Sequence, residues 1–239
     1  HIESVRGILN GTTNYVLTEM ERTRESFESV LARAQALGYA EADPSFDVDG
    51  IDAAHKLALL TSMAFGAELD FKDIAAEGIR GLLPVDFEMA REFGYRIKLL
   101  GVARCHREGQ SERIEAHVHP TMIPAGSMLA SVDAAMNAIE VRGDAVGTTL
   151  YYGAGAGELP TASAVVSDLM EIAREIRRGG SRPVAPLSYM PDHLVRKPLV
   201  PAGEHVGRCY LRFTAVDRPG VLSQIAGALG AQAVGIESV

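Results

Sequence analysis

The sequence predicts an α+β fold, in which helices cover one side of a mixed or antiparallel sheet and a partial βαβ unit follows. The apolar residues between positions 11 and 65 recur at helical spacing, whereas residues 95–119 and 137–152 form short runs typical of strands. Helical and strand segments that are grouped along a chain, rather than alternating, are typical of α+β architectures. With 239 residues, 47% of them hydrophobic, the chain is long enough to bury a sizeable core.

The first part of the chain is predicted to contain one strand and then three helices, at residues 2–9, about 15–20, 26–37 and 51–65. Asn10-Gly-Thr-Thr-Asn14 precedes the first helix, and Asn or Thr there can accept a hydrogen bond from a free backbone N–H as an N-cap. Gly38 follows the second helix and is a plausible C-terminal cap.

The second part is predicted to contain a short helix, four strands and a long helix, at residues 87–93, 95–104, 113–119, 137–142, 146–152 and 161–178. A polar turn at 106–112 separates the first two of these strands, and Gly179 and Gly180 end the long helix.

The last part changes in composition. Five prolines between residues 181 and 207 indicate a linker or an extended wrapping segment. Residues 209–216 and 233–239 are predicted as strands on either side of a helix that ends near Leu229. We therefore expect a main domain at 1–180, a linker at 181–207 and a partial domain at 208–239.

Composition excludes several classes of protein. No apolar run approaches the ~18 residues of a membrane-spanning helix, and the first residues lack the layout of a signal peptide, so we expect a cytoplasmic protein without membrane partners. The net charge of −8 argues against nucleic acid as a partner. Cys105 and Cys209 have no metal-ligand spacing and are expected to be free thiols. The chain lacks an initiator Met and opens within a strand pattern, which indicates a piece of a longer protein.

Residues 38–56 are rich in charge, and their ionisable side chains are Glu41, Asp43, Asp47, Asp49, Asp52, His55 and Lys56. Asp52 and Lys56 stand four apart at the start of a predicted helix and so share one face. A purely structural interpretation is strong, because Asp49 can cap the helix and Asp52 can complete an imperfect capping box. A calcium loop fails at both ends, since Ser45 stands at the first ligand position, where the motif has aspartate, and Lys56 stands where it has a bidentate glutamate.

The chemical interpretation is a polar amino-acid substrate held by carboxylates beside a lysine. When hydride reduces a carbonyl, negative charge develops on the oxygen, and a nearby ammonium stabilises that charge and supplies the proton. Lys56 suits that task, while Glu41 or Asp52 could pair with a substrate α-ammonium group.

Two other motifs are weaker. Gly153, Gly155 and Gly157 precede a helix, but Glu158 stands where a dinucleotide-binding turn has its third glycine, so a tight turn is favoured. His117 and His119 share one face of a strand, yet a surface pair is favoured over a metal site because no third ligand has suitable spacing.

Three segments together resemble homoserine dehydrogenase: Gly7-Ile-Leu-Asn-Gly-Thr-Thr-Asn-Tyr15, Leu37-Gly-Tyr-Ala-Glu-Ala-Asp-Pro44 through Asp49-Gly-Ile-Asp-Ala-Ala-His-Lys56, and Tyr152-Gly-Ala-Gly-Ala-Gly157 with Pro160-Thr-Ala-Ser-Ala-Val165. The resemblance covers nearly all of residues 1–178. It implies an oxidoreductase that interconverts L-homoserine and aspartate 4-semialdehyde with NADP or NAD. The reaction would be a step in the biosynthesis of threonine, isoleucine and methionine.

The resemblance also implies residue roles. Lys56 would be the proton donor, Glu41 and Asp52 would bind homoserine, and Asp47 would lie in the same pocket. Gly38 and Gly153 would lie against the cofactor, where a side chain would block the approach of the backbone. Many relatives have proline at Ala154, a departure expected to alter only the stiffness of the turn.

The family's nucleotide-binding domain, a further active-site lysine and the backbone ligands of a sodium ion are expected upstream, so the fragment alone is expected to be inactive. A homodimer or homotetramer is expected. Asp217-Arg-Pro-Gly-Val-Leu222 resembles the start of an ACT regulatory domain, which implies feedback control by threonine in related enzymes. The alternative is a noncatalytic amino-acid-sensing module in which the ACT-like end is the working part.

Overall fold

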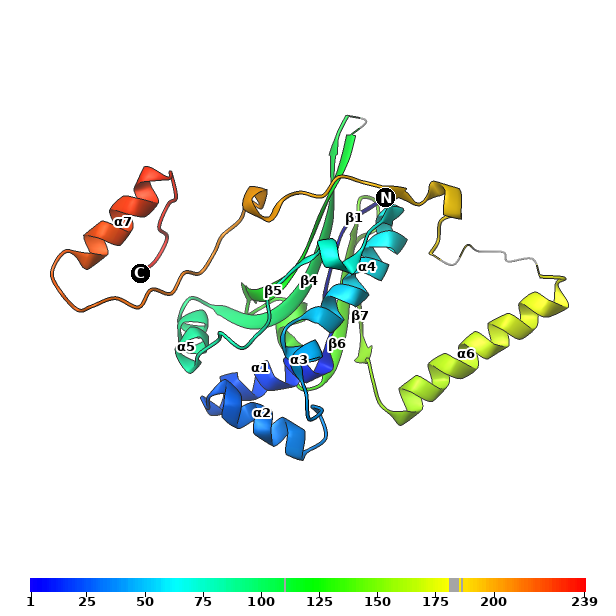
Figure 1. Cartoon of the computed structure of the whole chain (residues 1–239), viewed down its shortest axis with the longest axis horizontal. Coiled ribbons are helices and arrows are strands. Elements are labelled where there is room, and N and C mark those ends of the chain that lie inside the picture. Colours follow the sequence, from blue (N-terminus) through cyan, green and yellow to red (C-terminus); the bar gives the residue numbers. More distant parts are fainter. Residues whose placement is uncertain (110, 181–184, 186) are drawn as a thin grey trace. The chain divides into compact units, whose positions relative to one another are not determined.

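The computed structural model describes residues 1–109, 111–180, 185 and 187–239, and Figure 1 shows the arrangement of the elements. Contacts within the chain divide it into two units, His1–His205 and Val206–Val239, which are described separately.

The first unit is built on a six-stranded sheet with the strand order β3-β5-β4-β1-β6-β7. Its strands are β1 Ile2–Ile8, β3 Ala75–Ala76, β4 Tyr95–Glu108, β5 Ser111–Pro124, β6 Met136–Gly143 and β7 Gly147–Ala154. Only the short β3 runs parallel to its neighbour β5, while the other pairings in this sheet are antiparallel. The predicted combination of helices with a mostly antiparallel mixed sheet is confirmed.

Helices enclose the larger part of the core. They are α1 Gly11–Thr23, α2 Phe27–Ala36, α3 Ser45–Val48, α4 Ile51–Phe65 and α5 Pro84–Glu92. Of these, α1, α4 and α5 contact the sheet, while α2 packs on α1 and α3 packs on α1 and α4. Asn10 and Ser26 cap α1 and α2 as side-chain acceptors. In Figure 1, α4 runs along the sheet, and it contacts β1, β4 and β5.

The sheet contributes to two hydrophobic clusters because successive residues of a strand face opposite sides. On β4, Leu99 belongs to the larger cluster together with buried residues of the helices, whereas Leu100 belongs to a smaller cluster near residues 129–132. Gly101 lets α4 approach β4 closely, since a Cβ there would lie 2.8 Å from Leu9 Cδ1 and 3.4 Å from Leu57 Cδ1.

Several boundaries differ from the predictions. The strands β4 and β5 continue into the segment predicted as a polar turn, because Arg107 and Glu112 form a cross-strand ion pair there. The helix predicted at 87–93 begins at Pro84, a position in the first turn where proline is tolerated. The helix predicted at 161–178 is α6 Glu158–Arg177 and likewise begins earlier.

The proline-rich segment is more than a linker in its described part. Its short strand β8 Val195–Arg196 pairs in parallel with β2 Ala67–Glu68, which directly follows α4. Further along, the Ile114 N–H donates to the Pro198 carbonyl and the Val200 N–H donates to the Ile114 carbonyl. Residues 187–205, called the C-terminal strap from here on, therefore bind to the rest of the first unit, of which they are part. The prediction for residues 181–184 and 186 lies outside the described residues.

The second unit contains the predicted helix, observed as α7 Val221–Ala231. The strands predicted at 209–216 and 233–239 are not formed among the described residues, so the βαβ unit is not confirmed. A strand needs a neighbour to satisfy its backbone N–H and C=O groups, and neither segment is paired with another strand there. No helix among the described residues combines the length and apolar character that crossing a membrane requires.

Candidate active site

The candidate site is built around the first two turns of α4. Lys56 Nζ lies 2.7 Å from Asp52 Oδ2, as the four-residue spacing predicts, and it also donates to the Leu9 carbonyl at 3.1 Å. The Lys56 side chain is 48% exposed and that of Asp52 is 18% exposed. The ammonium is thus fixed at the surface by one carboxylate and one backbone oxygen and stays accessible to a small molecule.

Asn10 joins the two parts of the charged segment. Its buried side-chain amide donates to Asp47 Oδ1 at 2.7 Å and to Asp52 Oδ2 at 2.8 Å, while its own oxygen accepts from the Thr13 N–H. The sequence predicted only helix capping for Asn10. The cap is present, and the bonds to the two carboxylates could not be inferred, because 37 and 42 residues separate Asn10 from them.

Part of the charged segment is helical before the predicted helix at 51–65 begins. Asp47 lies on α3, and the N-cap of α4 is Gly50 in a left-handed conformation with φ of 81°. The capping roles predicted for Asp49 and Asp52 are therefore wrong. Asp49 instead pairs with Arg80, which also donates to Ser45 Oγ, while Asp52 pairs with Lys56 and Asn10.

Close backbone packing holds α3 against the connector that precedes α5. Gly78 lies against α3, because a Cβ there would come within 2.2 Å of the Val48 carbonyl oxygen and 2.5 Å of Asp49 Cα. The Ile79 N–H donates to that same carbonyl. Only glycine allows this approach, and it fixes the segment that bears Asp47.

The remaining predicted site residues make fewer contacts with the rest of the chain. Glu41 is exposed, and its backbone carbonyl accepts from Gln35 Nε2, with no side-chain partner found for it within the described part of the chain. Gly38 follows α2 with φ of 78°, and a Cβ at Gly38 or at Gly153 would meet no atom within 4 Å. The structure thus brings together Lys56, Asp52 and Asp47, while Glu41 lies outside this hydrogen-bonded group.

The glycine-rich turn after β7 lies beside the start of α1. Asn137 links the two, because a Cβ at Gly155 would overlap its amide and a Cβ at Gly11 would lie 3.4 Å from its Oδ1. That Oδ1 is buried and has no partner among the described residues. Gly155 of the turn and Gly11, which follows Asn10, therefore both pack against the Asn137 side chain.

A buried lysine secures the start of α1. Lys98 Nζ donates to the Val132 carbonyl at 2.6 Å, to Asp133 Oδ1 at 3.1 Å and to Asn14 Oδ1 at 3.2 Å. Burial lowers the pKa of Lys98, and the hydrogen bond to Asp133 opposes this shift. Three acceptors for three N–H groups indicate a structural role that supports the helix capped by Asn10.

The predicted surface pair of histidines is wrong in part, because His117 is buried. Its ring stacks on His119 with the centroids 4.5 Å apart, and its Nε2 lies 3.0 Å from Glu115 Oε1. Burial lowers the pKa of His117 although the hydrogen bond with Glu115 raises it. No group of three or more metal-ligating side chains with suitable geometry occurs within the described ranges.

Comparisons with known proteins place this geometry in a family. The homoserine dehydrogenase family model matches residues 1–170. The homoserine dehydrogenase of Pseudomonas aeruginosa is 50% identical over 238 residues, which cover 100% of this chain and 54% of the relative. The chain thus spans about half the length of the curated relatives it matches.

Solved structures agree. A homoserine dehydrogenase from Thiobacillus denitrificans has a TM-score of 0.86 and 46% identity, over 99% of this chain and 54% of that one. A hyperthermophilic archaeal homoserine dehydrogenase mutant in complex with NADPH has a TM-score of 0.59 and 25% identity, over 73% of this chain and 48% of that one. The chain belongs to the homoserine dehydrogenase family.

Proposed function

We propose that this chain forms the substrate-binding half of an NAD(P)-dependent homoserine dehydrogenase that interconverts L-homoserine and L-aspartate 4-semialdehyde. The observation that carries the proposal is the group formed by Lys56, Asp52, Asn10 and Asp47, in which an ammonium lies beside two carboxylates on a family-matched scaffold. A positive proton donor and negative partners for an amino group are what an amino-acid aldehyde requires.

Lys56 is proposed to transfer the proton. In the direction of reduction, hydride adds to the aldehyde carbon, the C=O π bond breaks, and the oxygen takes a proton from Lys56 Nζ to become the hydroxyl of homoserine. The ammonium has three N–H groups, of which Asp52 and the Leu9 carbonyl accept two. The third can point toward the substrate oxygen and stabilise its developing charge.

Asp52, Asp47 and Glu41 are proposed to hold the substrate. Asn10 engages one oxygen of Asp52 and one of Asp47, which leaves the second oxygen of each carboxylate for the α-ammonium group of the substrate. Glu41 is exposed, and we propose that its carboxylate adds a further negative partner for the substrate. Charge-assisted hydrogen bonds of this kind are roughly twice as strong as neutral ones.

The nicotinamide cofactor, when bound, supplies or accepts the hydride. The backbone at Gly38 and Gly153 fits its approach, since a Cβ at either position would project into open space. The NADPH complex of the archaeal family member supports nicotinamide use in the family. We propose that the part of the protein beyond this chain carries most of the nucleotide site and the sodium site, and that the chain alone does not turn over.

We further propose that residues 1–180 form the catalytic and dimerisation domain and that the assembled enzyme is a homodimer or homotetramer. Residues 208–239 are proposed to begin an ACT domain that responds to threonine. The alternative, a noncatalytic sensing module, is not favoured because the family match covers residues 1–170.

Replacement of Lys56 tests the proposed function. In the full-length enzyme, Lys56→Ala removes the group that donates the proton in reduction and accepts it in oxidation, and we expect kcat for homoserine oxidation to fall about 10²- to 10⁴-fold. Lys56→Arg is the matched control, because arginine keeps the charge beside Asp52 but holds its proton too tightly to transfer it. Both variants should melt within a few degrees of the wild type. Turnover preserved in either variant would contradict the assignment.

A further inference from the structure

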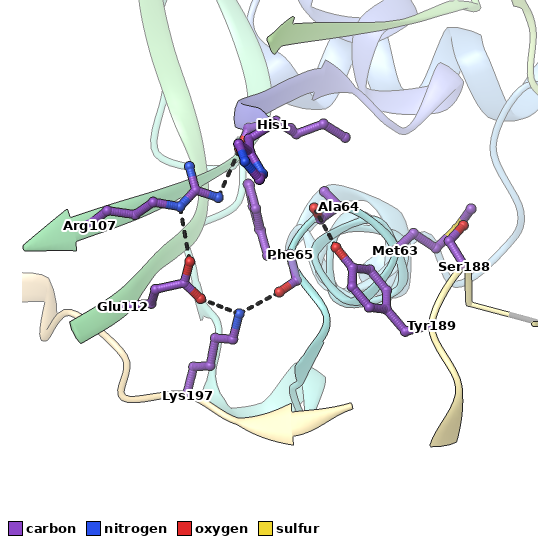
Figure 2. Close-up of a pocket in the computed structure, with 10 residues that line it drawn as sticks. His1, Met63, Ala64, Phe65, Arg107, Glu112, Ser188, Tyr189 and Lys197 are labelled. Carbon is purple, nitrogen blue, oxygen red and sulfur yellow. Dashed lines mark hydrogen bonds and ion pairs between the residues drawn. The ribbon is translucent and has the colours of Figure 1, made fainter. Parts of the chain in front are cut away.

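The C-terminal end of α4 is held by the C-terminal strap, which is more than 120 residues away in sequence. Lys197 Nζ donates to the Phe65 carbonyl at 2.5 Å, the Val195 N–H donates to the Gly66 carbonyl at 3.2 Å, and the Tyr189 hydroxyl lies 3.5 Å from the Ala64 carbonyl. Figure 2 shows Lys197 and Tyr189 approaching the last turn of α4. The strap therefore satisfies carbonyl groups that a helix end leaves without intrahelical partners.

Lys197 is the charged member of this contact. Its side chain is 15% exposed, and its ammonium also lies 2.6 Å from Glu112 Oε2, while Arg107 donates to the other oxygen of that carboxylate at 2.9 Å. Hydrogen bonds from Lys197 and Arg107 hold the pKa of Glu112 below its usual value. A cation at a helix C-terminus interacts favourably with the helix dipole, and Glu112 keeps it there.

Polar contacts and an open cavity characterise this attachment, in which the Tyr189 ring is the apolar group that packs against Gly66. A cavity of about 640 Å³ lies at the contact, and its lining includes Met63, Phe65, Arg107, Tyr189 and Lys197. Where apolar packing is incomplete, individual hydrogen bonds and ion pairs determine how firmly two segments are joined. Lys197 is therefore the residue whose loss should loosen the strap from α4 most directly.

The other end of α4 carries the candidate active site. Asp52 and Lys56 lie in its first two turns, and the helix runs without interruption from Ile51 to Phe65. Nine residues of α-helix separate Lys56 from Phe65, a rise of about 14 Å. Because a helix moves as a stiff rod, a shift at its C-terminal end tilts both site residues relative to Asn10 and Leu9, which belong to other elements.

We propose that Lys197 is a positioning residue, which acts through α4 to set the places of Asp52 and Lys56. This inference rests on the proposed function of those two residues.

The test compares three variants of the full-length enzyme. Lys197→Ala removes the contact with Phe65 and Glu112, and Lys197→Arg restores a cation. Glu204→Gln is the matched control, because it breaks the exposed ion pair of the strap with Arg113 and does not touch α4. Each variant is assayed for homoserine oxidation at 25 °C, where it is folded, and for amide hydrogen exchange in α4.

We expect Lys197→Ala to lower kcat/KM about tenfold or more, since small misplacements of reacting groups are costly. Amides in the last turn of α4 should exchange faster, Lys197→Arg should recover most of the activity, and Glu204→Gln should match the wild type. A lower melting temperature with unchanged kcat/KM and unchanged exchange in α4 would overturn the inference. If the wild type fails to oxidise homoserine, the proposed function fails, and the exchange data still decide whether Lys197 secures α4.

Discussion

Replacement of Asn10 separates helix capping from the organisation of the candidate site. Asn10→Ser keeps an oxygen that can cap α1 by accepting from the Thr13 N–H, but it is too short to reach Asp47 and Asp52. Asn10→Ala removes the cap as well. The two variants therefore share the loss at the carboxylates and differ only in the cap.

The magnitude follows from the bonds lost. The Asn10 amide makes two charge-assisted hydrogen bonds, at 2.7 and 2.8 Å, to partly exposed carboxylates. With about 1 kcal/mol for each bond, after allowance for competing solvent, the loss of organisation is about 2 kcal/mol. If this loss appears in substrate binding, KM for homoserine rises about 30-fold. The missing cap should make the Ala variant about 1 kcal/mol less stable than the Ser variant.

The assay is steady-state homoserine oxidation by the full-length enzyme, combined with chemical denaturation of each variant. Both variants should show the same rise in KM, and only Asn10→Ala should show the additional loss of stability. A KM within twofold of the wild type for Asn10→Ser would refute the reasoning, because the amide would then contribute nothing to placing Asp47 and Asp52.

Two further predictions concern stability. Chemical denaturation should show that Gly78→Ala lowers the free energy of unfolding by about 3 kcal/mol or more, because the added Cβ would overlap the Val48 carbonyl. Gly81→Ala is the control and should have little effect, because its Cβ would meet no atom within 4 Å. Burial lowers the pKa of His117, so the unfolded state takes up its proton first as pH falls through about 6.5, and stability should decline there. His117→Gln should weaken that decline between pH 7.5 and 5.5; an unchanged slope would contradict it.

Local pattern predicted much of the fold and part of the site. The helical spacing of residues 51–65 and the four-residue separation of Asp52 and Lys56 are properties of adjacent positions, and the structure shows both. The ends of elements were predicted less well. Charged cross-strand pairs such as Arg107 with Glu112 extend β4 and β5 beyond their apolar cores, and hydrophobic periodicity does not record such pairs.

The capping role of Asp49 shows where local reasoning fails. A carboxylate three positions before Asp52 is a good helix cap by sequence, yet Arg80 competes for it from 31 residues away. The burial of His117 has a similar origin, since His205 from the C-terminal strap contacts its ring, and that contact depends on how segments distant in sequence meet.

The sequence by itself determined the family resemblance, the α+β character of the chain and the face shared by Asp52 and Lys56, because these depend on spacing along the chain. Only the tertiary structure decided that Asn10 joins Asp47 to Asp52 and that Lys197 holds the far end of α4. Both are contacts between side chains or carbonyls far apart in sequence, and their geometry is set by the packing of helices on the sheet.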